Sequence, residues 1–71
     1  MIRLNVEYPG GINFQLDAQL RHLALINNGK FSGSGVTIKT KIRDIQFEFG
    51  IVADAEKFEL SMSEGIITTV L

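Results

Sequence analysis

The first residues of the chain alternate between apolar and polar side chains. One side of the alternation holds Ile2, Leu4, Val6 and Tyr8, and the other holds Arg3, Asn5 and Glu7. A period of two predicts a strand that is buried on one face. The Pro-Gly-Gly run at residues 9–11 ends this strand, because proline lacks an amide donor and glycine accepts the dihedral angles of turns.

Residues 12–28 allow two interpretations. Apolar residues occupy every second position from 12 to 20, as in a strand, but the second half of the segment is rich in Leu, Ala, Gln and Arg, which favour a helix. We therefore predict a helix over roughly residues 14–27, with Asn13 as its N-cap and the Asn-Asn-Gly run at 27–29 as its stop. The strand interpretation stays open, because Asn-Gly is also a strong hairpin turn.

The middle of the chain predicts a flexible Ser/Gly-rich run over residues 30–35 and a strand over 36–42, where β-branched side chains are frequent. At Arg43-Asp44 the apolar positions switch from even to odd numbers, which predicts a tight reversal or a bulge. The clearest strand of the chain follows over residues 45–49. The residues expected to be most deeply buried are Val6, Leu20, Leu23, Phe47 and Phe49.

The C-terminal part of the chain again allows a helix or a strand. A helix over roughly residues 54–64 would be capped by Asp54 and closed by Gly65, whereas the alternation around Phe58 would also suit a strand. On the helix interpretation the apolar face is Ala55, Phe58 and Met62. The last residues, 66–71, are rich in β-branched side chains and predict a strand.

These elements follow the order strand, helix, strand, strand, helix, strand. That order is typical of an α+β, ferredoxin-like βαββαβ fold, with a four-stranded antiparallel sheet and two helices on one face. A single domain over residues 1–71 is expected. The alternative is a small all-β barrel or meander, in which residues 12–28 and 54–64 are both strands.

Composition narrows the classes of function. The chain has no cysteine, which excludes disulfides, thiolate metal sites and a cysteine nucleophile and fits a cytoplasmic protein. Its formal charge of −1 argues against a dedicated nucleic-acid-binding domain, which is usually strongly basic. No apolar run approaches the ~20 residues that span a bilayer, so no membrane partner is expected.

The residues that could support catalysis are few. His22 is the only histidine, and no sequence motif supplies a nucleophile or a carboxylate to act with it. Asp44 and Glu48 share one face of a strand but stand about 13 Å apart along it, which is too far for a carboxylate pair. The Ser-Gly-Ser-Gly run at 32–35 precedes a strand and therefore lacks the helix N-terminus of a phosphate-binding loop. We expect no catalytic residue, no cofactor and no metal site.

Four basic residues form the one candidate site for a charged ligand. Lys39, Lys41 and Arg43 alternate along the predicted strand and, with Lys30, would form a basic strip. Such a strip predicts weak binding of an anion or a nucleic acid. The expectation is weakened by Asp44 and Glu48, whose carboxylates would repel phosphate.

The preferred hypothesis is a non-catalytic binding or assembly module that presents a surface, with another copy of the chain or another protein as its partner. The last strand carries apolar residues on both faces, because neighbouring side chains of a strand point in opposite directions. One of those faces needs a cover, and a two-fold homodimer is the commonest way to supply it. The residues expected at this contact are Ile66, Ile67, Thr69 and Leu71.

Overall fold

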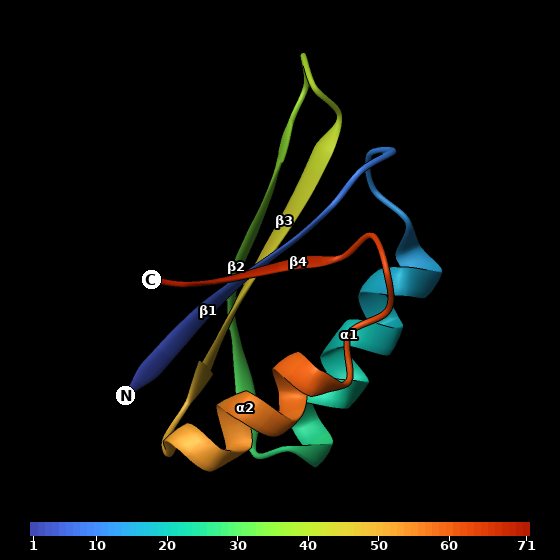
Figure 1. The fold of residues 1–71 in the computed structure, drawn as a ribbon. Helices are drawn as coiled ribbons and strands as arrows, with labels where there is room; N and C mark the ends of the chain where they lie inside the picture. Colours follow the sequence, from blue (N-terminus) through green and yellow to red (C-terminus); the bar gives the residue numbers. More distant parts are fainter.

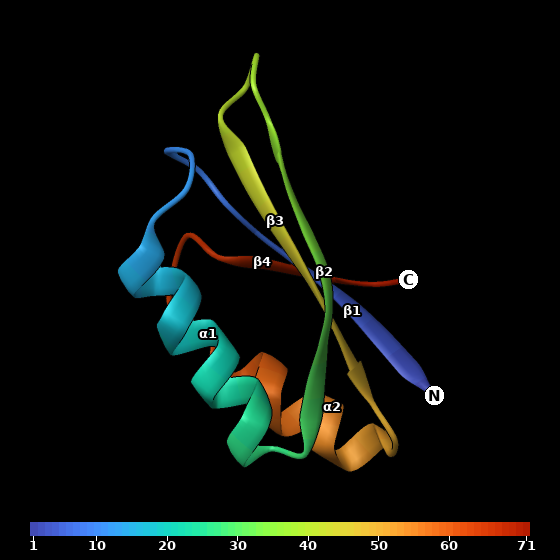
Figure 2. The same cartoon turned by 180° about the vertical axis from the view of Figure 1, so that it is seen from behind.

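A four-stranded antiparallel sheet carries two helices on one of its faces (Figure 1). The computed structural model describes all residues from 1 to 71. Its elements are β1 (Ile2–Tyr8), α1 (Phe14–Ile26), β2 (Gly29–Thr37), β3 (Ile42–Phe49), α2 (Val52–Leu60) and β4 (Ile67–Val70). Figure 1 looks towards β4, and Figure 2 shows β2 in front; in both views the second face of the sheet has no helix over it.

The strand order is β2-β3-β1-β4, and every neighbouring pair is antiparallel. The two central strands are therefore β3 and β1, and each helix connects a central strand to an edge strand. This is the predicted ferredoxin-like topology. Both ambiguous segments contain helices, so the all-β alternative is wrong.

The first helix begins and ends where its sequence predicts. The side chain of Asn13 accepts a hydrogen bond from the backbone N–H of Leu16 at 3.1 Å, as an N-cap does. At the other end Asn28 adopts a left-handed conformation with φ of 62°, which stops the helix. A side-chain bond from Asn27 to the carbonyl of Leu23 at 2.8 Å satisfies one of the last carbonyls.

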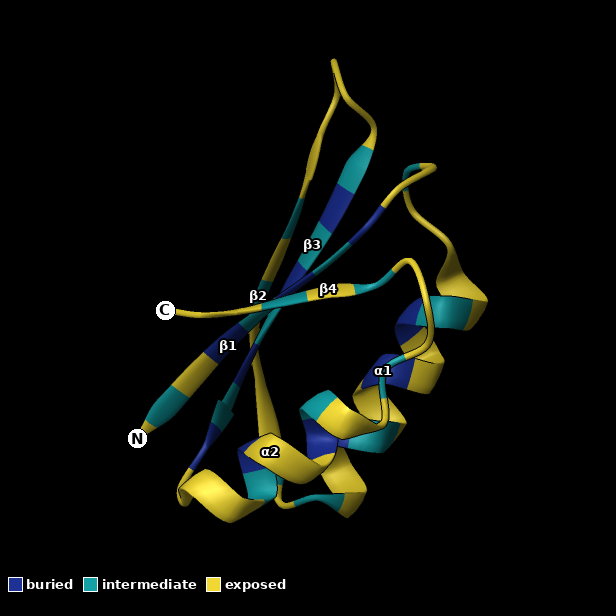
Figure 3. Ribbon diagram, viewed as in Figure 1, coloured by how far each residue is buried: buried dark blue, intermediate teal, exposed yellow.

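The core lies between the sheet and the helices (Figure 3). Phe47 and Phe49 of β3 are fully buried, and each packs against Phe58 of α2 with ring centroids 5.3 and 5.2 Å apart. Val6 and Leu20 are also buried, as predicted. Leu23 is only half-buried and packs at the margin of the core, so the prediction for this residue was too strong.

The hairpin between β2 and β3 differs from the prediction. The run at 30–35 belongs to β2, and the chain reverses at residues 38–41 rather than at Arg43-Asp44. In that turn Lys41 has φ of 57° and its N–H donates to the carbonyl of Thr37 at 2.7 Å. The ladder is irregular in β2 instead, between Phe31 and Gly33. The reversal or bulge predicted at Arg43-Asp44 is wrong, because β3 is continuous there and Arg43 points into the protein on the same face as Phe47.

The second helix begins two residues earlier and ends four residues earlier than predicted. Its N-cap is Ile51, which makes no side-chain capping bond, and Asp54 lies in the first turn, where its charge favours the positive helix end. Gly65 has φ of 89° in the turn before β4 and does not close the helix. The predicted apolar face is confirmed in part: Ala55 and Phe58 are buried, and Met62 packs at the edge of the core beyond the helix.

Replacement of Phe47 by alanine should lower the free energy of unfolding by about 3–5 kcal/mol, because a fully buried aromatic side chain leaves a cavity. Phe14→Ala is a matched control, since Phe14 is 82% exposed and its loss should change stability by no more than about 0.5 kcal/mol. Urea unfolding followed by circular dichroism measures both values. Equal losses in the two variants would contradict the assignment of Phe47 to the core.

Candidate functional site

A buried polar cluster joins β1, α1, β2 and β3. The Tyr8 hydroxyl donates a hydrogen bond to Asp17 Oδ1 at 2.5 Å, and the Arg43 guanidinium donates to Asp17 Oδ2 at 2.8 Å. Arg43 also donates to the carbonyl of Gly35 at 3.2 Å, and the backbone N–H of Asn13 donates to the Tyr8 oxygen at 3.0 Å. Asp17 and Arg43 are both more than nine-tenths buried. No buried side-chain polar atom of the chain lacks a hydrogen-bond partner.

The cluster shifts the pKa values of its three titratable members. Burial opposes ionisation of Asp17, but hydrogen bonds from Arg43 and Tyr8 outweigh this and hold the pKa of the carboxyl below its ordinary 3.8. Burial and the hydrogen bond to Asp17 raise the pKa of the Tyr8 phenol above its ordinary 10.0. The hydrogen bond to Asp17 raises the pKa of the Arg43 guanidinium. Asp17 and Arg43 are therefore charged and Tyr8 is neutral at neutral pH.

Sequence reasoning missed this cluster, although two signals indicate it. Asp17 precedes the buried residues Leu20 and Ala24 by three and seven positions, so the three share one face of α1. Arg43 has the same parity in β3 as the buried phenylalanines. A carboxylate and a guanidinium that both occupy core-facing positions are expected to pair, because an unpaired buried charge is costly.

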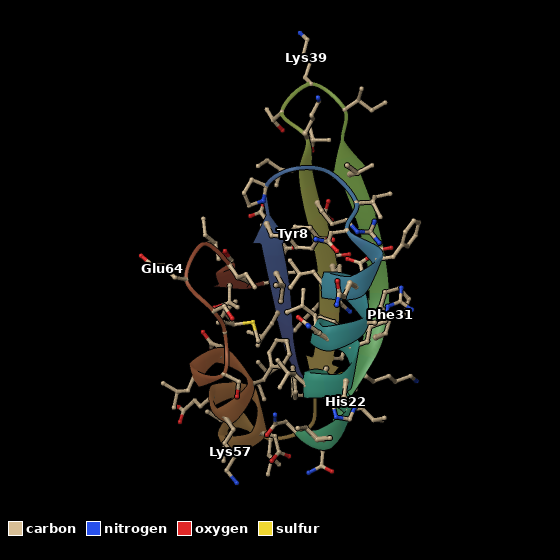
Figure 4. All side chains as sticks on the ribbon, turned by 90° about the vertical axis from the view of Figure 1, so that its right-hand side faces the viewer. Tyr8, His22, Phe31, Lys39, Lys57 and Glu64 are labelled. Atoms are coloured by element: carbon tan, nitrogen blue, oxygen red, sulfur yellow. The ribbon has the colours of Figure 1, made fainter.

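A shallow groove lies beside the cluster, between α1 and the β2–β3 hairpin. It is lined by Phe14, Asp17, Ala18, Arg21 and Arg43. The Arg21 guanidinium lies 4.1 Å from the centroid of the Phe31 ring in β2, a cation–π contact that ties the helix to this edge strand. His22 is exposed on the same helix (Figure 4).

The four residues predicted to form a basic strip do not come together. Arg43 is buried and paired with Asp17, so it is not part of an exposed strip. Lys39 and Lys41 belong to the hairpin turn, and Lys30 lies at the opposite end of β2, which is nine residues long. The premise that three of these residues alternate along one strand is wrong. Binding of an anion by the exposed lysines stays a prediction.

The uncovered face of the sheet is polar over its central strands. Gln46 of β3 donates hydrogen bonds to Asn5 Oδ1 at 2.5 Å and to Asp44 Oδ2 at 2.7 Å, and Arg3 pairs with Glu48 at 3.5 Å. These contacts hold Asp44 and Glu48 on either side of Gln46 in a solvated surface. No group of three or more His, Cys, Asp or Glu residues in the chain is arranged to hold a metal ion.

The C-terminal strand is the apolar part of this face. Ile67 and Leu71 are 63% and 65% exposed, and Thr69 lies exposed between them. Ile66, which was expected at the same contact, is half-buried and packs against the core. Of the four residues predicted to form an oligomer contact, three therefore share an exposed surface, and Ile66 does not.

Charge is divided between the two edges of the molecule. We call residues 14–41, which contain α1, β2 and the hairpin turn, the basic edge, and residues 52–71, which contain α2 and β4, the acidic edge. The basic edge carries four basic side chains against one acidic, and the acidic edge carries four acidic against one basic, for formal charges of +3 and −3. The basic edge holds Arg21, Lys30, Lys39, Lys41 and Asp17; the acidic edge holds Asp54, Glu56, Glu59, Glu64 and Lys57.

The two charged edges lie on opposite sides of the molecule and are linked by the hydrogen bond that Asn28, after α1, donates to Asp54 of α2 at 3.4 Å. Figure 4, seen from the helix side, shows α1 and Phe31 on one side and α2 with Lys57 and Glu64 on the other, with Lys39 at the tip of the hairpin. Asp17, the single acid of the basic edge, is buried and neutralised by Arg43 of β3. The exposed charge of that edge is therefore entirely basic.

No protein family, curated protein or solved structure matches this chain. Neither of its helices has the length and apolar character required to cross a membrane.

Stability should depend on pH through the buried cluster. The pKa of Asp17 is lowered by folding, so its contribution to stability is present above about pH 4 and is lost as the pH falls through the folded value. The pKa of Tyr8 is raised, so its contribution is present below about pH 10 and is lost as the pH rises further. Urea unfolding at a series of pH values from acid to alkaline measures the loss of stability at both ends of the range. The ultraviolet spectrum of Tyr8, the only tyrosine, reports its ionisation.

The variant Tyr8→Phe isolates the role of the hydroxyl. It should lose about 1.5–3 kcal/mol at neutral pH, the usual range for a hydrogen bond to a charged group. It should also show no loss of stability above pH 10 and a smaller loss in acid. Glu64→Gln removes an exposed carboxylate as a control and should keep the wild-type profile. A Tyr8→Phe profile identical to that of the wild type would show that the cluster does not control the pH dependence.

Proposed function

We propose that this chain is a small, non-catalytic assembly module that associates with further copies of itself through β4. The observation that carries the proposal is that β4 combines exposed apolar side chains with an unpaired backbone edge at the border of a sheet. The exposed side chains and the unpaired backbone support association in different ways.

The exposed side chains favour burial. Both helices lie on the other face, so no element of the chain covers Ile67 and Leu71. Their neighbours on β1 are the charged residues Glu7 and Arg3, which places the apolar surface at the border of the sheet rather than at its centre. Removal of such side chains from water contributes roughly 25 cal/mol for each Å² buried.

The backbone of β4 is open to a further strand. The N–H of Leu71 donates to the carbonyl of Arg3 at 2.9 Å, which places Leu71, Thr69 and Ile67 in the hydrogen-bonded pairs of the ladder with β1. The residues between them, Thr68 and Val70, direct their N–H and C=O groups away from β1. Natural edge strands are protected by short length, lysine, proline or a bulge; β4 is short, with four residues, but it has no lysine, proline or bulge.

Catalysis is not part of the proposal. The buried titratable groups are engaged with one another, and His22 lies exposed on α1. A cytoplasmic location belongs to the proposal and is favoured by the absence of cysteine. Anion binding through Lys30, Lys39 and Lys41 has less support than self-association. Arg43 is buried, and Lys30 lies at the opposite end of β2 from the other two lysines.

Sedimentation equilibrium at micromolar concentration tests the proposal. The wild-type chain should have an average mass above the 7.9 kDa of one copy, and Ile67→Lys should return it to that value because a charge would be buried at the contact. Ile51→Lys is a matched control, since Ile51 is 58% exposed and lies outside both β4 and the two charged edges. A wild-type mass of one copy, unchanged by Ile67→Lys, would refute self-association.

A further inference from the structure

We infer that the contact is heterologous: β4 on the acidic edge of one copy pairs with β2 on the basic edge of the next, so that the sheet continues from copy to copy. This inference rests on the proposed self-association and specifies its partner surface. It differs from the two-fold dimer expected from sequence, in which β4 would meet β4.

Strand direction permits this contact. Because neighbouring strands alternate in direction across the order β2-β3-β1-β4, the two edge strands run in opposite directions. A second copy placed beside the first, and rotated to follow the twist of the sheet, therefore sets its β2 antiparallel to β4 of the first. Its helices then lie on the same side of the continued sheet as those of the first copy.

The registers also match. Read across the sheet through β1 and β3, Ile67 stands level with Gly35, and Thr69 stands level with Gly33. The first three residues of β4 therefore stand level with the regular part of β2 after its bulge, and Val70 stands level with Phe31 before it. Glycine at these two positions of β2 lets another backbone approach closely, because no side chain of β2 stands in the way.

Charge selects this contact over the symmetric ones. A two-fold contact between β4 strands would bring together two edges of formal charge −3, and one between β2 strands would bring together two edges of +3. The heterologous contact brings opposite charges together, and like charges placed across an interface disfavour the wrong partner. Lys30 at one end of β2 and Lys39 beyond its other end would flank the added strand.

Apolar side chains are available on both sides of the contact. The acidic edge exposes Leu60 of α2 and Val70 of β4, and the basic edge exposes Phe14 of α1 and Phe31 of β2. Across the sheet Val70 stands level with Phe31, on the helix side. The contact therefore buries apolar side chains at its centre and places oppositely charged side chains around them, as in many protein interfaces.

Two double charge reversals test the inference. The basic-edge variant is Lys30→Glu with Lys39→Glu, and the acidic-edge variant is Glu56→Lys with Glu64→Lys. All four side chains are exposed and make no hydrogen bond or ion pair within the chain, so both variants should fold as the wild type does by circular dichroism. Sedimentation equilibrium then gives the mass of each variant alone and of an equimolar mixture.

A heterologous contact predicts a specific set of masses. The wild type should grow beyond two copies as concentration rises, because such a contact leaves one free edge at each end, and added salt should reduce its mass. Each variant alone carries two edges of like charge, so its apparent dissociation constant should rise more than about tenfold. The mixture should regain assembly, since each variant then meets the opposite charge on the other.

Three results separate the possibilities. If the wild type stops at two copies, or if the basic-edge variant keeps the wild-type mass, the contact is a two-fold β4 contact and the heterologous inference is overturned while self-association stands. If the wild type has the mass of one copy at all concentrations, the proposed self-association fails as well. If the mixture of variants stays at one copy while the wild type assembles, charge does not select the contact and the inference also fails.

Discussion

The ion pair between Asp17 and Arg43 sets the geometry of this small domain. It joins α1 to β3, and the further hydrogen bonds of the two side chains reach β1 through Tyr8 and β2 through Gly35. A buried pair of this kind adds little net stability compared with apolar packing, but loss of one partner is costly. Its effect is therefore to specify one arrangement of four elements. The hairpin, whose far end is the exposed turn at 38–41, is oriented by this attachment to α1.

The same pair explains the main error of interpretation from sequence. The apolar positions change from even at Ile42 to odd at Ile45, and a charged Arg43 was not expected to face the core, so the strand seemed to be interrupted at residues 43–44. In the folded chain β3 runs without interruption from Ile42 to Phe49, because Asp17 supplies the counter-charge that allows Arg43 to point inward. A pairing between residues 26 positions apart cannot be read from local periodicity. That periodicity predicted the buried face of β3 correctly wherever the side chains were apolar.

Local signals specified the first helix better than the second. Asn13, the helix-forming composition and the left-handed Asn28 agree with one another, so α1 could be predicted to within one residue. The second helix has no capping side chain, and its extent depends on contacts of Phe58 with the sheet. The reason for glycine at position 29 could not be found from local sequence either. Gly29 was interpreted as part of a helix stop, but a Cβ there would lie 2.6 Å from Phe49 Cζ. The close approach, rather than the turn, requires glycine.

The topology of the fold places residues of opposite charge, which lie in different segments of the sequence, on opposite sides of the molecule. A formal charge of −1 describes a nearly neutral chain, yet the basic residues are concentrated in the segment that contains α1 and β2, and the acidic residues in the segment that contains α2 and β4. In this fold α1 leads from the central strand β1 to the edge strand β2, and α2 leads from the central strand β3 to the other edge strand, β4. Two segments of opposite charge are therefore carried to opposite edges, where strand backbones are free to pair. Net charge alone would indicate no preference among partners, whereas the same residues in this topology favour an edge of opposite sign.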